Sequence, residues 1–266
     1  SDCYARMAQM ARLTGHDDEA AAFEARREAL NRTIHARFYD PATQTYATGS
    51  QLDMTYPMLV GATPDSLRAG VEQRLFRLTH DVMKDHIGGG LVGVPVITRW
   101  AVRSHNPEFI YRMLKQRGYP GYLHMIDHGA TATWEYWSGE RSRVHNCYNG
   151  IGTWFYQALG GLRTDSSHPG YEHVFIDPQI PEGVEWCRIG KETPYGRIDL
   201  GWEIADGELR IDVTLPPGVT ATAITPAGAC RGRLDGRRLA PQSPGTKIAS
   251  GRHRLVFGLA PQNERQ

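Results

Sequence analysis

The sequence predicts an α-helical half followed by an antiparallel β half, and three observations support this fold class. Residues 1–163 carry apolar side chains at helical spacing, whereas apolar and polar residues alternate from residue 164 onward. A length of 266 residues is enough for one large domain or two of medium size. The chain is 40% hydrophobic and 22% charged, as is usual for a globular protein. We therefore expect a helical domain at 1–163 and a β-sandwich domain at 164–266.

The helical half opens with two segments rich in Ala, Glu and Arg, which favour helix. The first, ARMAQMARLTG, ends at Gly15, and the second covers residues 17–40, with Asp17 and Asp18 as candidate caps. A third helix is predicted at 63–85, because its first residues are Thr-Pro-Asp, a cap followed by proline. Shorter helices are expected at 51–60, 92–103, 107–117 and 147–160, which makes about seven helices in all.

The second half has the alternation and turn residues of short strands. Segments such as EHVFIDPQ, LRIDVTLPPG and TATAITPAG alternate apolar and polar residues. The run GRIDLGWEI, then ADG, then ELRIDVTL indicates a hairpin. About seven or eight strands fit between residues 171 and 258, and we predict an antiparallel sandwich.

Composition argues against several classes of partner and cofactor. Thirty basic residues against 29 acidic ones give a net charge of +1 without a basic stripe, so no nucleic-acid partner is expected. No run of 18 apolar residues occurs, so no membrane-spanning helix is expected. The four cysteines, at positions 3, 147, 187 and 230, form no CxxC pair and are expected to be free and mostly buried. No metal or organic cofactor is indicated.

The stretch HGATATWEYW at 128–137 places a carboxylate, Glu135, among Trp134, Tyr136 and Trp137. One interpretation is a structural core with one ionisable group at its edge. The other is a sugar site, in which aromatic rings stack on a pyranose and a carboxylate acts on water. The local sequence leaves both interpretations open.

The segment GATATWEYW at 129–137 resembles the GATTxWERW motif of the bacterial α-L-rhamnosidases, which are inverting glycoside hydrolases. Five further segments resemble motifs of that family in the family's order. They are GGGLVG at 88–93, Tyr-Pro at 119–120, SRVHNCYNGIGTWFYQALGGL at 142–162, PGYEHVFIDPQ at 169–179 and TPYGRIDLGW at 193–202.

The resemblance implies a six-hairpin (α/α)6 barrel with a C-terminal β-sandwich. Such a barrel needs twelve helices, so about seven correspond to a partial toroid, the second half of the barrel. The family's general acid lies in a motif similar to DCPQRDERLGWTGD, which these residues do not contain. We therefore expect the chain to be a C-terminal fragment, with the general acid and the missing N-terminal part of the enzyme outside it.

The resemblance also implies roles for individual residues. The family's general base falls on Glu135, and its sugar-binding histidine falls on His145. Trp134 and Trp137 would stack on the sugar, as would Tyr122, which stands where the family usually has tryptophan. The alternative for His145 is a buried structural histidine, and for the three aromatic residues it is core packing.

The sequence departs from the family pattern at two further positions beside these residues. Tyr136 stands where the family usually has arginine, and Val144 stands where it has asparagine.

The activity that the resemblance implies is hydrolysis of terminal α-L-rhamnosides, from rhamnose-containing glycosides or polysaccharides, with inversion. Two alternatives remain open at this level. One is another (α/α)6 glycosidase that acts on a different sugar. The other is a non-catalytic carbohydrate-binding or structural remnant of such an enzyme.

Overall fold

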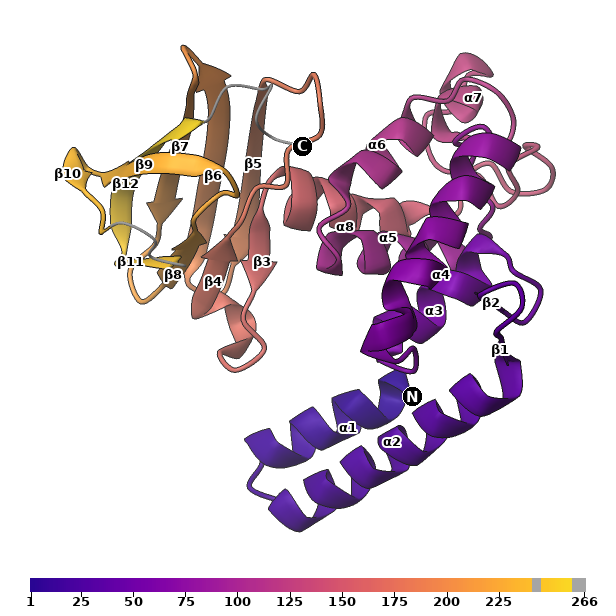
Figure 1. Ribbon diagram of the computed structural model, residues 1–266. Helices are drawn as coiled ribbons and strands as arrows, with labels where there is room; N and C mark the ends of the chain where they lie inside the picture. The colour runs from indigo at the N-terminus through magenta and orange to yellow at the C-terminus, as the bar shows by residue number, and fades with distance from the viewer. Residues whose placement is uncertain (241–244, 260–266) are drawn as a thin grey trace. The chain divides into compact units, whose positions relative to one another are not determined.

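The computed structural model describes residues 1–240 and 245–259, which form helices followed by β-sheets as predicted (Figure 1). The chain divides into two compact units. Unit 1 comprises Ser1–Ser104 and Phe109–Ile151, and unit 2 comprises His105–Glu108 and the chain from Gly152 onward. The domain boundary predicted between residues 163 and 164 stays a prediction.

Unit 1 contains the predicted long helices and one short helix that the sequence pattern did not indicate. The unpredicted helix is α7 (Tyr122–Asp127), and a small hairpin of β1 (Tyr39–Asp40) and β2 (Thr45–Tyr46) was also missed. The remaining helices are α1 (Asp2–Leu13), α2 (Asp17–Phe38), α3 (Gln51–Val60), α4 (Asp65–Arg77), α5 (Gly93–Arg103) and most of α6 (Pro107–Leu114). A π-helical turn, η1 (Leu78–Val82), continues α4.

Helices α1 and α2 lie side by side as a hairpin (Figure 1). The N-cap of α2 is His16, so the predicted caps Asp17 and Asp18 instead lie in its first turn. Carboxylates there still favour the helix, because they lie at the positive end of its dipole.

Helix α3 has the predicted bounds because both of its ends are capped. The Ser50 hydroxyl accepts a hydrogen bond from the Asp53 backbone N–H at 3.1 Å, and the Asp53 carboxylate accepts one from the Ser50 backbone N–H at 3.4 Å, which forms a capping box. Gly61, with φ of 75°, ends the helix in the left-handed conformation. Capping therefore accounts for the polar residue at position 53, while Met54 and Met58 are buried.

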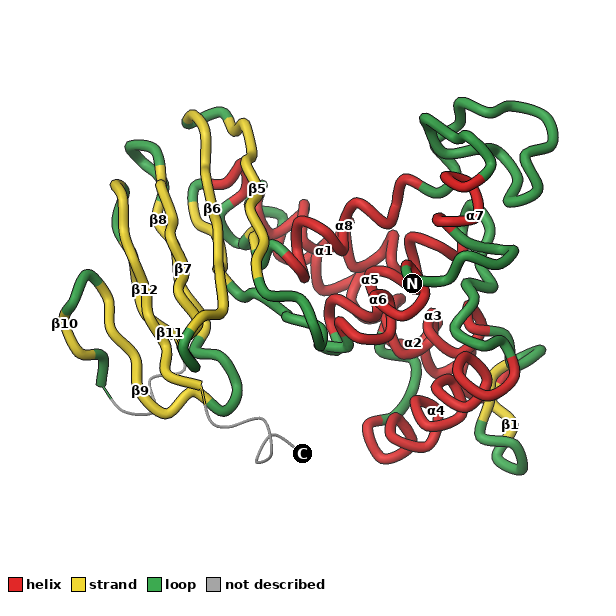
Figure 2. Tube along the Cα trace, turned by 90° about the horizontal axis from the view of Figure 1, so that it is seen from above, coloured by secondary structure: helices red, strands yellow, loops and turns green. Residues whose placement is uncertain are grey.

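Unit 2 contains two sheets, whose strands lie side by side in Figure 2. The six-stranded sheet has the order β10-β9-β12-β7-β6-β5, and the four-stranded sheet has the order β11-β8-β4-β3. Neighbours are antiparallel except β4 and β8, which pair in parallel. The strands are β3 (Leu162–Thr164), β4 (His173–Ile176), β5 (Trp186–Thr193), β6 (Gly196–Ala205), β7 (Glu208–Leu215), β8 (Thr220–Ile224), β9 (Ala229–Leu234), β10 (Arg237–Arg238), β11 (Gly245–Ile248) and β12 (Gly251–Leu259).

Short helical turns precede the strands of unit 2. They are α8 (Gly152–Trp154) and the π-helical η3 (Phe155–Leu159), which follow the 3-10 turn η2 (Asn149–Ile151) that ends unit 1. Together they occupy the segment for which one helix was predicted at 147–160.

Alternation along the strands separates a buried face from a polar face. On β6, Ile198, Leu200 and Trp202 are buried in one hydrophobic cluster with residues of both sheets. The Trp202 indole N–H donates to the Leu159 carbonyl at 2.7 Å, so the largest core side chain has its polar atom satisfied. Asp199 and Glu203, which alternate with these residues along the strand, are exposed. The outer face of the six-stranded sheet is therefore polar.

Three cysteines lie in the part of the chain for which side chains are described, and all three are free. Only Cys147 is buried, whereas Cys3 is exposed and Cys187 is half-buried. The expectation of mostly buried cysteines is therefore wrong for Cys3, and the side chain of Cys230 lies outside the described residues. Among the described residues, no helix combines the length and apolar character needed to cross a membrane.

The turn that follows β9 and the neighbouring strand β12 share a pH-sensitive pair. The His253 ring lies 2.8 Å from the Asp235 carboxylate, which raises the pKa of His253 above its usual 6.5. A hydrogen bond from the Arg254 backbone N–H, and then one from His253, lower the pKa of Asp235 below 3.8. The contribution of this pair to the free energy of unfolding is therefore fully present below the pKa that His253 has in the unfolded chain. It is lost as pH rises through the pKa of His253 in the folded protein.

We expect His253→Gln to lower the melting temperature more at about pH 5.5 than at about pH 8.5, because only the protonated ring pairs with Asp235. Thermal denaturation of both proteins at the two pH values measures the difference. Asp235→Asn serves as the matched variant and should show the same pH dependence. An equal loss of melting temperature at both pH values would contradict the assignment of His253 and Asp235 as a pH-sensitive pair.

Candidate active site

Four of the five predicted site residues lie on a long loop of unit 1, residues 128–148, between α7 and η2, and Tyr122 is the first residue of α7. Two backbone hydrogen bonds fold this loop back on itself. The Glu135 N–H donates to the Ser142 carbonyl at 2.9 Å, and the His145 N–H donates to the Thr133 carbonyl at 2.8 Å. Glu135 and His145, ten residues apart in the sequence, are therefore held on facing segments of one loop.

The Glu135 carboxylate is held on one side and open on the other. One oxygen accepts a hydrogen bond from the Ser142 backbone N–H at 3.3 Å, and the other lies 4.0 Å from the Arg141 guanidinium. The side chain is 25% exposed, and that of Arg141 is 71% exposed. An ion pair this long and this exposed contributes little and does not lock the carboxylate. Glu135 can therefore meet a water molecule.

Arg141 has a second contact, because its guanidinium lies 5.5 Å from the centre of the Tyr136 ring. This contact holds the cation over Tyr136, the residue that stands where the family pattern has arginine. Neither Arg141 nor Ser142 was predicted as a site residue, because their approach to Glu135 depends on the fold of the loop.

Two of the predicted aromatic residues belong to one stacked group. Trp137 stacks on Tyr148 at 3.8 Å, and Tyr122 meets Trp137 edge-on at 5.2 Å. The Tyr122 hydroxyl donates to the Tyr148 carbonyl at 2.8 Å. Burial raises the pKa of Tyr122 far above its usual value, so the hydroxyl keeps its proton and remains a donor. Tyr148 was not predicted.

Trp134 lies under a different part of the loop. Its ring contacts Gly139, where an added Cβ would come within 2.8 Å of the indole, and the Arg143 guanidinium lies 5.2 Å from the ring centre. Trp134 is 3% exposed and Trp137 is 8% exposed. This burial supports the core-packing alternative for both indoles, and their sugar contacts stay a prediction.

The glycine run is held by the aromatic group on one side and by a buried glutamine on the other. The Trp137 indole N–H donates to the Gly89 carbonyl at 2.9 Å, and the Gly88 N–H donates to the Gln51 side-chain oxygen at 2.7 Å. The Gln51 amide nitrogen donates to the His86 carbonyl at 3.1 Å and to the Thr79 hydroxyl at 3.0 Å. Gln51, only 1% exposed, thus positions the segment against which Trp137 is fixed.

Helix capping does not explain the polar residue at position 51. The cap of α3 is Ser50, and Gln51 points into the unit. We expect Gln51→Leu to lower the free energy of unfolding by about 2–4 kcal/mol, because the Gly88 N–H and the Thr79 hydroxyl lose their buried partner. Denaturant unfolding measures the loss, and Gln73→Leu, at an exposed residue of α4, is the matched control.

Among the residues that the structure describes, no group of three or more His, Cys, Asp or Glu side chains converges on a point that could hold a metal ion.

Comparison with protein families finds two consecutive matches. The family model described as the bacterial alpha-L-rhamnosidase 6 hairpin glycosidase domain matches residues 1–159. The model described as the bacterial alpha-L-rhamnosidase C-terminal domain matches residues 161–237. The first match alone covers more than half of the chain.

Curated proteins and solved structures give the same result. An alpha-L-rhamnosidase of Alteromonas is 24% identical over 241 residues, which is 84% of this chain and 26% of that protein. A crystal structure of the Streptomyces avermitilis alpha-L-rhamnosidase complexed with L-rhamnose superposes with a TM-score of 0.83 at 23% identity, over 94% of this chain and 25% of that one. For the alpha-L-rhamnosidase structure from Dictyoglumus thermophilum the TM-score is 0.86 at 18% identity, over 96% of this chain and 30% of that one. The chain thus spans about a quarter of the length of these relatives.

Proposed function

The chain belongs to the bacterial α-L-rhamnosidase family, and from this membership we propose that the whole protein hydrolyses terminal α-L-rhamnosides with inversion. The observation that carries the proposal is the state of Glu135: a partly exposed carboxylate, anchored through one oxygen by the Ser142 N–H. A side chain held in this way can accept a proton in one defined direction.

Inversion needs two carboxyl groups on opposite faces of the sugar ring, about 6.5–9.5 Å apart. In our proposal Glu135 takes a proton from a water molecule as that water attacks the anomeric carbon. The bond from this carbon to the leaving oxygen breaks, and a second carboxyl group protonates that oxygen. This general acid lies in a part of the enzyme beyond these 266 residues, in line with the quarter of the relatives' length that the chain spans.

We assign sugar binding to the residues around Glu135. His145, on the facing segment of the loop, can offer one donor and one acceptor to sugar hydroxyls when its ring is neutral. Tyr122, Trp134 and Trp137 form the apolar wall. The burial of both indoles means that they act through the edges they present or by holding the loop in shape.

We also propose the division of labour between the two halves of the chain. Residues 1–163 form part of the catalytic six-hairpin barrel, and residues 164–266 form the β-sandwich domain. The matches to two separate family models, at 1–159 and 161–237, support this division.

A panel of nitrophenyl glycosides tests the proposed activity on the full-length protein. We expect release of nitrophenol from the α-L-rhamnoside and not from the α-L-fucoside or the β-D-glucoside. Proton NMR at early times should show β-L-rhamnose as the first product, because water attacks the face opposite the leaving group. Hydrolysis of a different glycoside would favour another sugar specificity, and no hydrolysis of any would favour a non-catalytic remnant.

A further inference from the structure

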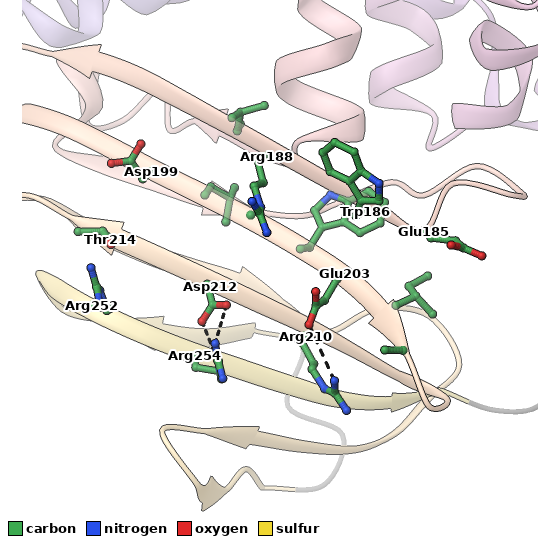
Figure 3. A pocket seen from close by; sticks show the side chains of 16 residues that line it. Glu185, Trp186, Arg188, Asp199, Glu203, Arg210, Asp212, Thr214, Arg252 and Arg254 are labelled. Carbon is green, nitrogen blue, oxygen red and sulfur yellow. Dashed lines mark hydrogen bonds and ion pairs between the residues drawn. The ribbon is translucent and has the colours of Figure 1, made fainter.

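The outer face of the six-stranded sheet in unit 2 is hollowed into a groove of about 820 Å³ (Figure 3). This volume lies within the range of about 300–1,000 Å³ that is typical of ligand pockets in proteins. All the residues that line the groove lie between Glu185 and Arg254. The groove therefore belongs to the β-sheet unit alone and does not include Glu135.

A glycine forms the floor of the groove. Gly201 on β6 lies between Arg188 on β5 and Asp212 on β7, in one row across the strands. An added Cβ at Gly201 would lie 3.2 Å from the Cγ atom of Arg188. The absent side chain thus leaves a depression between the edge strand and the middle of the sheet.

An exposed indole forms one wall. Trp186 lies on the edge strand β5, opposite Glu203 of β6, and is 66% exposed. It points to the same face as Arg188, two residues further along β5 (Figure 3). A large ring that stays exposed beside a depression offers a flat apolar surface for a ligand, and it can bind with little loss of rotamer entropy.

The other wall consists of charged side chains that are already paired. Arg254 contacts Asp212 through two hydrogen bonds, of 2.7 and 2.8 Å, and Arg210 lies 3.8 Å from Glu203 (Figure 3). Four arginines and four carboxylates line the groove, so its formal charge is zero. This balance provides many hydrogen-bond donors and acceptors without a net field, and it therefore favours a neutral polyhydroxyl ligand over a polyanion.

We propose that this groove binds a neutral saccharide chain, with one pyranose ring stacked on Trp186 above the floor formed by Gly201. Arg188 donates hydrogen bonds to the hydroxyls of that ring, and the Asp212–Arg254 pair contacts the next sugar. The groove is a binding site and performs no chemistry. It goes beyond the proposed hydrolysis and does not depend on it.

Isothermal titration of the full-length protein with cellohexaose, xylohexaose, mannohexaose and a rhamnose hexasaccharide tests the proposal, with hexagalacturonate as the acidic probe. The Glu135→Gln variant serves as background, so that a rhamnose-terminated chain is not consumed. We expect at least one neutral hexasaccharide to bind. Its affinity should fall about tenfold or more in Trp186→Ala, because the stacking surface is lost.

Two further variants make the result specific to the groove. Gly201→Val fills the floor, and valine is favoured in a strand, so we expect a folded protein that has lost the same binding. Arg188→Ala removes the proposed donor and should weaken the same binding, whereas Arg238→Ala, on β10 outside the groove, is its matched control and should bind as the parent does. Melting curves confirm that each variant is folded.

The proposal is overturned if no neutral hexasaccharide binds, or if binding survives in both Trp186→Ala and Gly201→Val. Binding of hexagalacturonate alone would also overturn it, because a groove without net charge should not prefer an anion. Rhamnoside hydrolysis is tested on other residues. A groove that binds no saccharide therefore leaves the proposed activity standing, and a protein without hydrolytic activity leaves the proposed groove standing.

Discussion

Replacement of Glu135 by glutamine in the full-length protein should lower kcat on an α-L-rhamnoside by about a thousandfold or more. The amide keeps the size of the side chain and cannot take a proton from the attacking water. Ser142 keeps its backbone position, so we expect KM to change by less than about threefold. Steady-state kinetics with nitrophenyl α-L-rhamnoside measure both values.

The control for this change lies five residues away on the same loop. Glu140 is exposed, and Glu140→Gln removes the same charge without touching the Glu135 carboxylate. We expect its kcat to stay within about twofold of the parent. Full activity in Glu135→Gln would exclude Glu135 as the base, and equal losses in both variants would point to the charge of the loop instead.

Replacement of Trp137 by alanine should have the second large effect. The indole is 8% exposed, stacks on Tyr148 and donates to the Gly89 carbonyl. Its loss leaves a cavity and an unpaired carbonyl, and we expect the free energy of unfolding to fall by about 3–5 kcal/mol. Denaturant unfolding followed by circular dichroism measures this change.

Two variants separate packing from sugar contact at Trp137. Trp137→Phe keeps a stacked ring and loses the hydrogen bond to Gly89, so its stability should fall by less than that of the alanine variant. If Trp137 also contacts the sugar, the phenylalanine variant should have a higher KM at unchanged kcat. Tyr136→Ala, at an exposed neighbouring residue, is the control, and a stability loss as large as that of Trp137→Ala would contradict the packing argument.

The sequence by itself determined the order of helices and sheets, because amphipathic spacing and alternation are local patterns. Helix α3 illustrates this, since its capping serine and terminal glycine are both visible in the sequence. The order of the family motifs likewise identified Glu135 and His145 as candidates. Short α7 carried no such signal, because six residues are too few to show a period.

Only the tertiary structure decided which side chains meet. Ser142 and Arg141 approach Glu135 because backbone hydrogen bonds fold the 128–148 loop, and Gln51 reaches Gly88 across 37 residues. The groove beneath Trp186 arises from four strands laid in register around Gly201, and Arg254, which completes this row, lies far from that glycine in the sequence. Such contacts depend on long-range pairing and burial, which a local pattern of residues does not encode.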